Sequence, residues 1–240
     1  MCDDFRPRLK SADLQKLAAE RLAALKAQGN ELHPITNTSR KLANNFWGRA
    51  WMKQLALCES GGMCLAPGRT LLRHGCVLDL QISSCCIRAH ISAEELYEVE
   101  IRLRPLDDET LARLTTSCSQ HIDSLMSLLE GRLSAPLLEQ LCHPEHGLLP
   151  TPADWHMSCT CPDWSEPCPH AAAAIYAAGC MIDTDPQLLF TLRGITPETL
   201  LASPGKTLDI DTGKLESMFG IEIDTPDMQH RELDAQHGEW

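Results

Sequence analysis

The sequence predicts an α+β fold, in which a small antiparallel sheet with packed helices is followed by a cysteine-rich strand-turn-helix segment and an acidic tail. Three observations predict this fold. Residues 77–103 alternate apolar and polar side chains, residues 13–28 repeat apolar side chains at helical spacing, and residues 205–240 are rich in carboxylates. With 240 residues and 43% hydrophobic content, the chain can bury one large core or two smaller ones.

The predicted sheet is a meander of three short strands at residues 77–82, 86–91 and 97–103. In the third strand the odd positions are apolar, and the even positions are Glu or Arg. Because successive side chains of a strand point to opposite faces, one face of the sheet belongs to the core and the other to solvent.

The same reasoning, applied with a period of 3.6 residues, predicts helices before and after the sheet. Gly29 and Asn30 form a stop signal for the first helix, and the acidic residues that follow Leu106 suit the first turn of another. The predicted helices span residues 13–28, 45–58, 107–118, 121–132 and 136–141.

These patterns divide the chain into four parts. They are an N-terminal helix and linker at 1–37, an α+β domain at 38–150, a cysteine-rich finger with following helices at 151–204, and an acidic C-terminal tail at 205–240. Charge is unevenly spread over them. The net charge is −12, yet residues 38–104 carry nine Lys and Arg against six acids, and the tail carries three against nine. The tail and the basic block could therefore attract each other.

The finger holds a complete set of metal ligands in the pattern C-x-C-x6-C-x-H. The ligands are Cys159, Cys161, Cys168 and His170. Each half of the pattern places two ligands at i and i+2, on one side of an extended segment. Three thiolates and one imidazole predict one structural Zn²⁺, because a rubredoxin-type iron site prefers four Cys and a catalytic zinc keeps an open position.

An alanine-rich helix is predicted to follow the ligands. Pro169 suits its first position, and we expect Gly179 to end it. This places Cys168 and His170 at a helix N-terminus, where the dipole and free amides stabilise a thiolate.

A group of cations and aromatic residues precedes the sheet and is the candidate nucleic-acid or partner surface. Its members are Arg40, Lys41, Arg49, Lys53, Trp47 and Trp51. The aromatic rings could stack on bases or on a partner, but they could also simply fill the core, since large aromatic side chains dominate core burial. The residues alone leave both interpretations open.

Several classes of function are disfavoured. The chain has no phosphate-binding loop of the helicase type, no His-Glu-x-x-His and no Gly-x-Ser-x-Gly, so we expect no catalytic residues and no small-molecule substrate. No apolar run approaches the ~20 residues of a membrane span, and the N-terminus lacks the apolar stretch of a signal peptide. We therefore expect a cytoplasmic protein with no membrane partner, in which most of the twelve cysteines are reduced.

The ligand pattern, with Asp163 and Trp164 after the second Cys and an alanine-rich helix after the His, resembles the SWIM zinc finger. Further segments are similar to bacterial SWIM proteins that accompany Swi/Snf-type helicases, namely 45–51, 68–70, 75–80, 186–190 and 192–195. The similarity covers roughly residues 40 to 200. After Gly68-Arg69, where the family is expected to have an aromatic residue and a basic pair, this chain has residues 70–74, TLLRH.

The resemblance implies a zinc-binding, non-catalytic module that binds DNA, protein or both, with a Swi/Snf-type helicase or another protein as the expected partner. The alternative is a protein-interaction scaffold with a purely structural zinc and no contact with nucleic acid. The salt dependence of DNA binding separates the two, because neutralising phosphates releases counterions.

Overall fold

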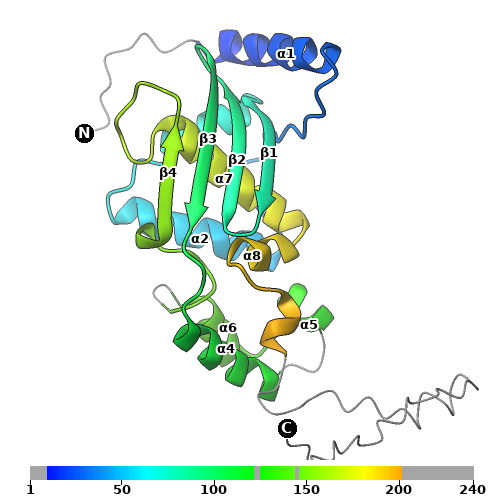
Figure 1. The fold of residues 1–240 in the computed structure, drawn as a ribbon, viewed down its shortest axis with the longest axis vertical. Coiled ribbons are helices and arrows are strands. Elements are labelled where there is room, and N and C mark those ends of the chain that lie inside the picture. The colour runs from blue at the N-terminus through cyan, green and yellow to red at the C-terminus, as the bar shows by residue number, and fades with distance from the viewer. Residues whose placement is uncertain (1–9, 122–124, 144–145, 202–240) are drawn as a thin grey trace, which may run out of the picture. The chain divides into compact units, whose positions relative to one another are not determined.

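The computed structural model describes residues 10–121, 125–143 and 146–201, and Figure 1 shows their fold. All of these residues belong to one compact unit that spans residues 1–204. The predicted acidic tail, residues 205–240, lies outside the described residues, as do positions 122–124 of the helix expected at 121–132.

The fold is α+β, as predicted, and is built on a four-stranded antiparallel sheet. The three strands of the meander are confirmed, and the strand that leads into the finger is added beside the third. The strands, in spatial order, are β1 (Val77–Ser83), β2 (Cys86–Ser92), β3 (Leu96–Leu103) and β4 (Trp155–Cys159). In the last pair, Val99 lies opposite Cys159 and Leu103 opposite Trp155.

One face of the sheet is core and the other is solvated. Along β3 the side chains of Tyr97, Val99, Ile101 and Leu103 are buried, while those of Glu98 and Arg102 are exposed. On the solvated face Glu100 pairs with Arg88 at 3.0 Å and with Arg102 at 2.7 Å. The alternation of apolar and charged residues predicted for the third strand therefore matches the alternation of buried and solvent-facing side chains at residues 97–103.

One helix covers the buried face, and two others pack against that helix. In Figure 1 helix α7 (Pro169–Thr184) runs behind the strands, and it contacts all four of them. Helices α2 (Phe46–Ser60) and α3 (Ala66–Arg73) pack against α7 in turn. Helix α3 approaches α7 so closely that a Cβ added at Gly68 would lie 2.4 Å from the backbone carbon of Ala172.

Helix α7 does not end at Gly179, as we expected, but continues to Thr184. Gly179 is instead a packing position: a Cβ there would lie 2.4 Å from Cδ1 of Trp51 and 2.7 Å from Cε of Met52. The glycine thus makes room for the indole of α2, and the cost of a glycine within a helix is offset by burial of that ring.

The remaining helices lie around this core. Helix α1 (Ser11–Ala27) is fastened to the end of β2 by Arg21, which donates to the Ser92 hydroxyl and the Ala93 carbonyl. The others are α4 (Asp108–His121), α5 (Leu125–Leu129), α6 (Ala135–Leu141), α8 (Gln187–Leu192) and the short 3-10 helices η1 (Pro152–Asp154) and η2 (Pro197–Leu200). No described helix is long and apolar enough to cross a membrane.

The finger and the α+β region share one core. The sequence suggested separate parts at 38–150 and 151–204, but β4 completes the sheet and α7 is its main cover. Residues 1–204 accordingly form one compact unit. The physical reason is that α7 is buried along most of its length, including four successive alanines from Ala171, so it requires the apolar face of a sheet to pack on.

Candidate functional site

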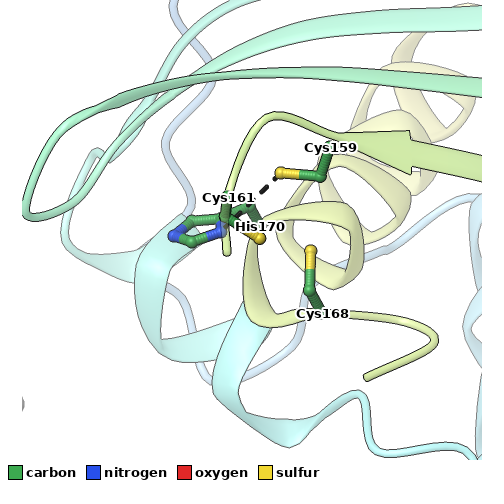
Figure 2. A group of neighbouring side chains, drawn as sticks. All are labelled: Cys159, Cys161, Cys168 and His170. Atoms are coloured by element: carbon green, nitrogen blue, oxygen red, sulfur yellow. Dashed lines mark hydrogen bonds between the residues drawn. The ribbon is translucent and has the colours of Figure 1, made fainter. Parts of the chain in front are cut away.

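The four predicted ligands converge at the junction of β4 and α7 (Figure 2). Cys159 is the last residue of β4, Cys161 lies in the turn, and Cys168 and His170 flank the start of α7. One ligand atom from each residue lies within 4.8 Å of the other three. Among the described residues, these four side chains form the group that is placed to hold a metal ion.

Local structure explains why these side chains meet. In β4 the side chains of Trp155, Met157 and Cys159 turn toward the core, while His156 and Ser158 are exposed. At the start of α7, Cys168 is the N-cap residue, and its Sγ accepts a hydrogen bond from the backbone N–H of Ala171 at 3.4 Å.

The cluster fits one zinc ion. Ligand atoms about 2.0–2.3 Å from a tetrahedral zinc lie about 3.3–3.8 Å from one another. Cys159 Sγ and His170 Nδ1 are 3.9 Å apart, and Cys168 and His170 are 4% and 7% exposed. A zinc ion held by these residues would tie the end of β4 to the start of α7, with four protein ligands completing its coordination.

Electrostatics within the cluster favours a thiolate at Cys168. The hydrogen bond from Cys159 lowers the pKa of Cys168 to about 4, and His170 and the Ala171 amide act in the same direction. The same hydrogen bond raises the pKa of Cys159. Metal ligation requires all three thiols to be deprotonated, so zinc binding would release protons from the cluster.

Two other residues near the finger are not ligands. His156 is exposed on the opposite face of β4 from Cys159, as its position three residues earlier predicts. Cys180 donates from Sγ to the Leu42 carbonyl at 3.5 Å.

The ring of Tyr97 packs against the His170 ring with centroids 4.2 Å apart, so the sheet itself supports the imidazole.

The loop between Cys161 and Cys168 presents Trp164 to solvent. This side chain is 97% exposed, and next to it the Ser165 amide donates to Asp163 Oδ1 at 2.9 Å. In the sequence, only the resemblance to the SWIM zinc finger singles out Trp164. Its exposure is a property of the tertiary fold, in which this loop joins the end of β4 to the start of α7.

The four predicted cations are all exposed, and the fold gathers most of them. Arg40 and Lys41 precede α2, which carries Arg49 and Lys53. A pocket of about 270 Å³ brings Arg40, Lys41 and Arg49 together with two arginines of α3 that are not among the predicted surface residues. We call this the cationic pocket, and its basic residues are Arg40, Lys41, Arg49, Arg69 and Arg73. Lys53 instead lines, with Arg49, a second pocket between α2 and α6.

The prediction that Trp47 and Trp51 lie on a binding surface is wrong. They are 0% and 1% exposed, and their indole N–H groups donate to the carbonyls of Leu128 and Ile175 at 2.9 and 3.1 Å. Trp51 also stacks on Trp155, with ring centroids 6.0 Å apart. The alternative interpretation, that these rings fill the core, is the one the fold realises, because each indole gains both apolar burial and a partner for its N–H.

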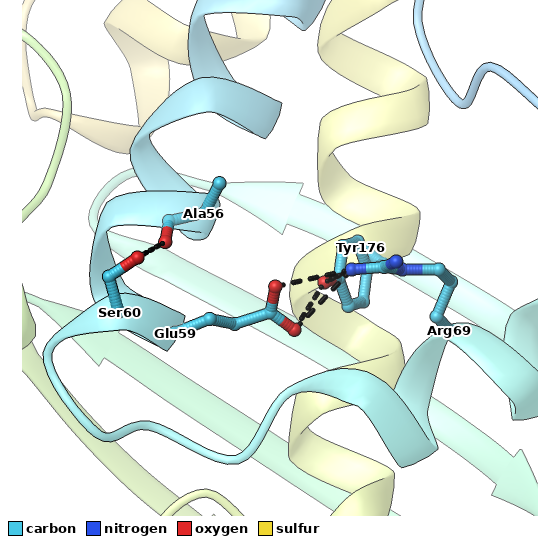
Figure 3. Close-up of polar contacts among 5 residues, drawn as sticks. All are labelled: Ala56, Glu59, Ser60, Arg69 and Tyr176. Atoms are coloured by element: carbon cyan, nitrogen blue, oxygen red, sulfur yellow. Dashed lines mark hydrogen bonds and ion pairs between the residues drawn. The ribbon is translucent and has the colours of Figure 1, made fainter.

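A polar triad forms one wall of the cationic pocket (Figure 3). Arg69 Nη2 donates to the Tyr176 hydroxyl at 2.6 Å and lies 3.3 Å from Glu59 Oε2. The Tyr176 hydroxyl donates to Glu59 Oε1 at 3.1 Å, and the Arg69 guanidinium lies over the Tyr176 ring, 5.0 Å from its centroid. Burial raises the pKa of Tyr176, and the hydrogen bond to Tyr176 raises the pKa of Arg69.

Comparison with known proteins agrees with the geometry of the metal site. Residues 157–179, which contain all four ligands, match the family model of the SWIM zinc finger. The chain therefore contains a SWIM zinc finger, which is a binding module rather than a catalytic one.

A longer similarity extends to an uncharacterized protein, Rv2102, of Mycobacterium tuberculosis. The two chains are 25% identical over 170 residues, which is 70% of this chain. The matched region spans 61% of the length of Rv2102. No solved structure matches this chain.

Proposed function

We propose that this protein is a zinc-stabilised, non-catalytic SWIM module that binds DNA in the cytoplasm as an accessory of a Swi/Snf-type helicase. The observation that carries the proposal is the cationic pocket: five Lys and Arg residues from three separate segments line one surface in a chain of net charge −12. The similarity of the finger and its flanking segments to helicase-associated SWIM proteins supports the choice of partner.

Electrostatics explains why this surface suits a polyanion. The pocket residues Arg40, Lys41, Arg49 and Arg73 make no ion pair with any other described residue, so no described side chain neutralises their charges. Contacts between such side chains and phosphates release condensed counterions, which provides affinity without reading base sequence.

The metal site supports a binding role over catalysis. Catalytic zinc keeps a coordination position for water or substrate, whereas three Cys and one His supply four ligands here. Zinc in this site would hold β4, a strand of the sheet, to α7, the helix against which α2 and α3 pack.

Measurement of zinc content and DNA affinity on one preparation tests the proposal. We expect one zinc per chain and binding to a short duplex that weakens as salt rises. Arg40→Gln, Lys41→Gln and Arg49→Gln should each reduce both the affinity and the salt dependence, whereas Arg102→Gln, on the solvated face of the sheet, should change neither. Zinc without salt-sensitive binding by the full chain would contradict DNA as the ligand.

A second candidate is a protein-interaction scaffold that never contacts nucleic acid. The observation that favours it is the pocket between α2 and α6, about 550 Å³ in volume, whose lining includes Leu57, Leu138 and Leu149. Leu57 is 47% exposed, and Trp164 on the finger loop is 97% exposed. Under this candidate, Leu57→Ser or Trp164→Ala would abolish binding to a purified Swi/Snf-type helicase and would leave zinc content unchanged.

A further inference from the structure

We propose that the cationic pocket is a phosphate-binding site, in which Arg69 is the anchoring residue and Arg40, Lys41, Arg49 and Arg73 complete the charge. The inference rests on the proposed function in one respect: the backbone of DNA is the expected source of the phosphate. It adds a defined site and an anchor that the predicted basic surface did not contain.

The lining of the pocket is strongly unbalanced in charge. Its described residues include five Lys and Arg but a single carboxylate, that of Glu59. Glu59 is already engaged by Arg69 and by the Tyr176 hydroxyl. The remaining cations thus surround a concave space in which no other described residue supplies a counterion, an arrangement that concentrates positive potential where a ligand would enter.

Arg69 is held in place before any ligand arrives. Hydrogen bonds to Glu59 and Tyr176 engage its Nη2, and the Tyr176 ring lies beneath the guanidinium. Its Nε is buried and has no acceptor among the described residues. A guanidinium fixed by its neighbours loses less conformational freedom on binding than a free one, and it retains donors for an anionic oxygen.

The arrangement fits a phosphate better than a carboxylate. A carboxylate presents two oxygens in a plane and is satisfied by a single guanidinium fork. A phosphate presents oxygens in several directions, and here cations come from the segment before α2, from α2 and from α3. The apolar side chains of Leu42 and Met52 also line the pocket and would contact a sugar or another apolar part of the ligand.

Gly68 gives α3 the position that the site requires. Because it has no side chain, α3 lies against the backbone of α7 at Ala172. Arg69, the next residue, can then reach Tyr176 one turn further along α7. The two neighbouring residues Gly68 and Arg69 therefore act together: the glycine allows the close helix contact, and the arginine lies beside Tyr176.

The test uses the full-length zinc-loaded protein and two phosphate sources, a short DNA duplex and inorganic pyrophosphate. The variants are Arg69→Gln, Tyr176→Phe and Arg73→Gln, and Arg88→Gln is the matched control, since Arg88 is exposed on the sheet and paired with Glu100. Arg73 is exposed at the end of α3, so its substitution tests the pocket even where changes at Arg69 disturb folding.

We expect Arg69→Gln and Arg73→Gln each to weaken DNA binding about five- to tenfold and to reduce the salt slope by about one unit, as expected for a lost phosphate contact. Tyr176→Phe should weaken binding less, because the charge remains but its orientation is lost. Arg88→Gln should stay within about twofold of the wild type. Pyrophosphate should compete with DNA in the wild type and not in Arg69→Gln.

The outcomes separate the site from the function. DNA binding that is unchanged in Arg69→Gln and Arg73→Gln overturns the pocket but leaves the proposed function standing. Pyrophosphate binding that is lost in these variants, without any DNA binding, supports the pocket, assigns it to a small phosphate compound and overturns the proposed function. Binding of neither probe overturns both.

Discussion

At the scale of single residues, the metal site depends most plainly on Cys161. This residue lies in the turn between β4 and α7, and its Sγ contacts the Asp163 carbonyl at 3.9 Å. The turn is hydrogen-bonded to β3 at Thr160, which donates to the Glu98 carbonyl at 3.1 Å, but residues 162–167 belong to no helix or strand. A metal ion bound by Cys161 would add a further tie between this part of the loop and the rest of the fold.

We expect Cys161→Ser to lose zinc and to be less stable by about 3 kcal/mol, because a structural metal site supplies much of its own folding free energy. In a chain of this size that loss lowers the melting temperature by about 6–12 °C. Elemental analysis and thermal unfolding by circular dichroism measure both effects. Cys86→Ser, a half-buried cysteine of β2, is the control; a Cys161→Ser protein that keeps its zinc and its transition would refute the ligand assignment.

A second prediction concerns Trp51, which the fold places in the core. Trp51→Phe removes the hydrogen bond to Ile175 and leaves part of the indole volume empty. We expect a loss of about 1–3 kcal/mol in the free energy of unfolding, measured with denaturant. DNA affinity of the folded variant should equal that of the wild type. A weaker affinity without a change in stability would return Trp51 to the binding surface.

At the scale of elements, the contact between α3 and α7 is set by one glycine. Alanine is normally favoured over glycine in a helix by ~1 kcal/mol, so propensity alone predicts that Gly68→Ala stabilises. The Cβ, however, would meet the backbone of Ala172 and Ala173 at 2.4 Å. Backbone atoms cannot rotate away, and the two helices must move apart.

We therefore expect Gly68→Ala to destabilise the protein by about 2–3 kcal/mol, the cost typical of an overpacked core. Denaturant unfolding measures the sign directly. Thr70→Ala, at an exposed position of the same helix, should be neutral within about 0.5 kcal/mol. A Gly68→Ala protein as stable as the wild type would show that α3 does not need this close approach, and DNA binding by that variant would test whether Arg69 keeps its place.

At the scale of the whole molecule, the net negative charge opposes the proposed binding of DNA. The chain carries −12, and residues 205–240 contribute −6 of this. Removal of residues 205–240 should strengthen DNA binding several-fold at low salt and progressively less as salt rises, because screening shortens the range of the repulsion. Fluorescence anisotropy at a series of salt concentrations tests this, and an affinity that is unchanged at low salt would assign the tail no electrostatic role.

The sequence by itself determined the metal ligands and most of the secondary structure. Cys159, Cys161, Cys168 and His170 could be identified because ligand chemistry restricts both residue type and spacing. The strands at 77–103 could be identified because alternation along a strand is local information. The cations Arg40, Lys41 and Arg49 were also visible, as an excess of charge in one block.

Only the tertiary structure decided what these parts do together. Three findings depend on contacts between residues distant in the sequence. They are the burial of Trp47 and Trp51, the continuation of helix α7 beyond Gly179, and the pairing of β4 with β3. The same is true of Arg69, which reaches Tyr176 across 107 positions. A local sequence pattern indicates whether a segment is a helix or a strand and which chemical groups it carries. Which other residues its side chains contact depends on how the segments pack against one another.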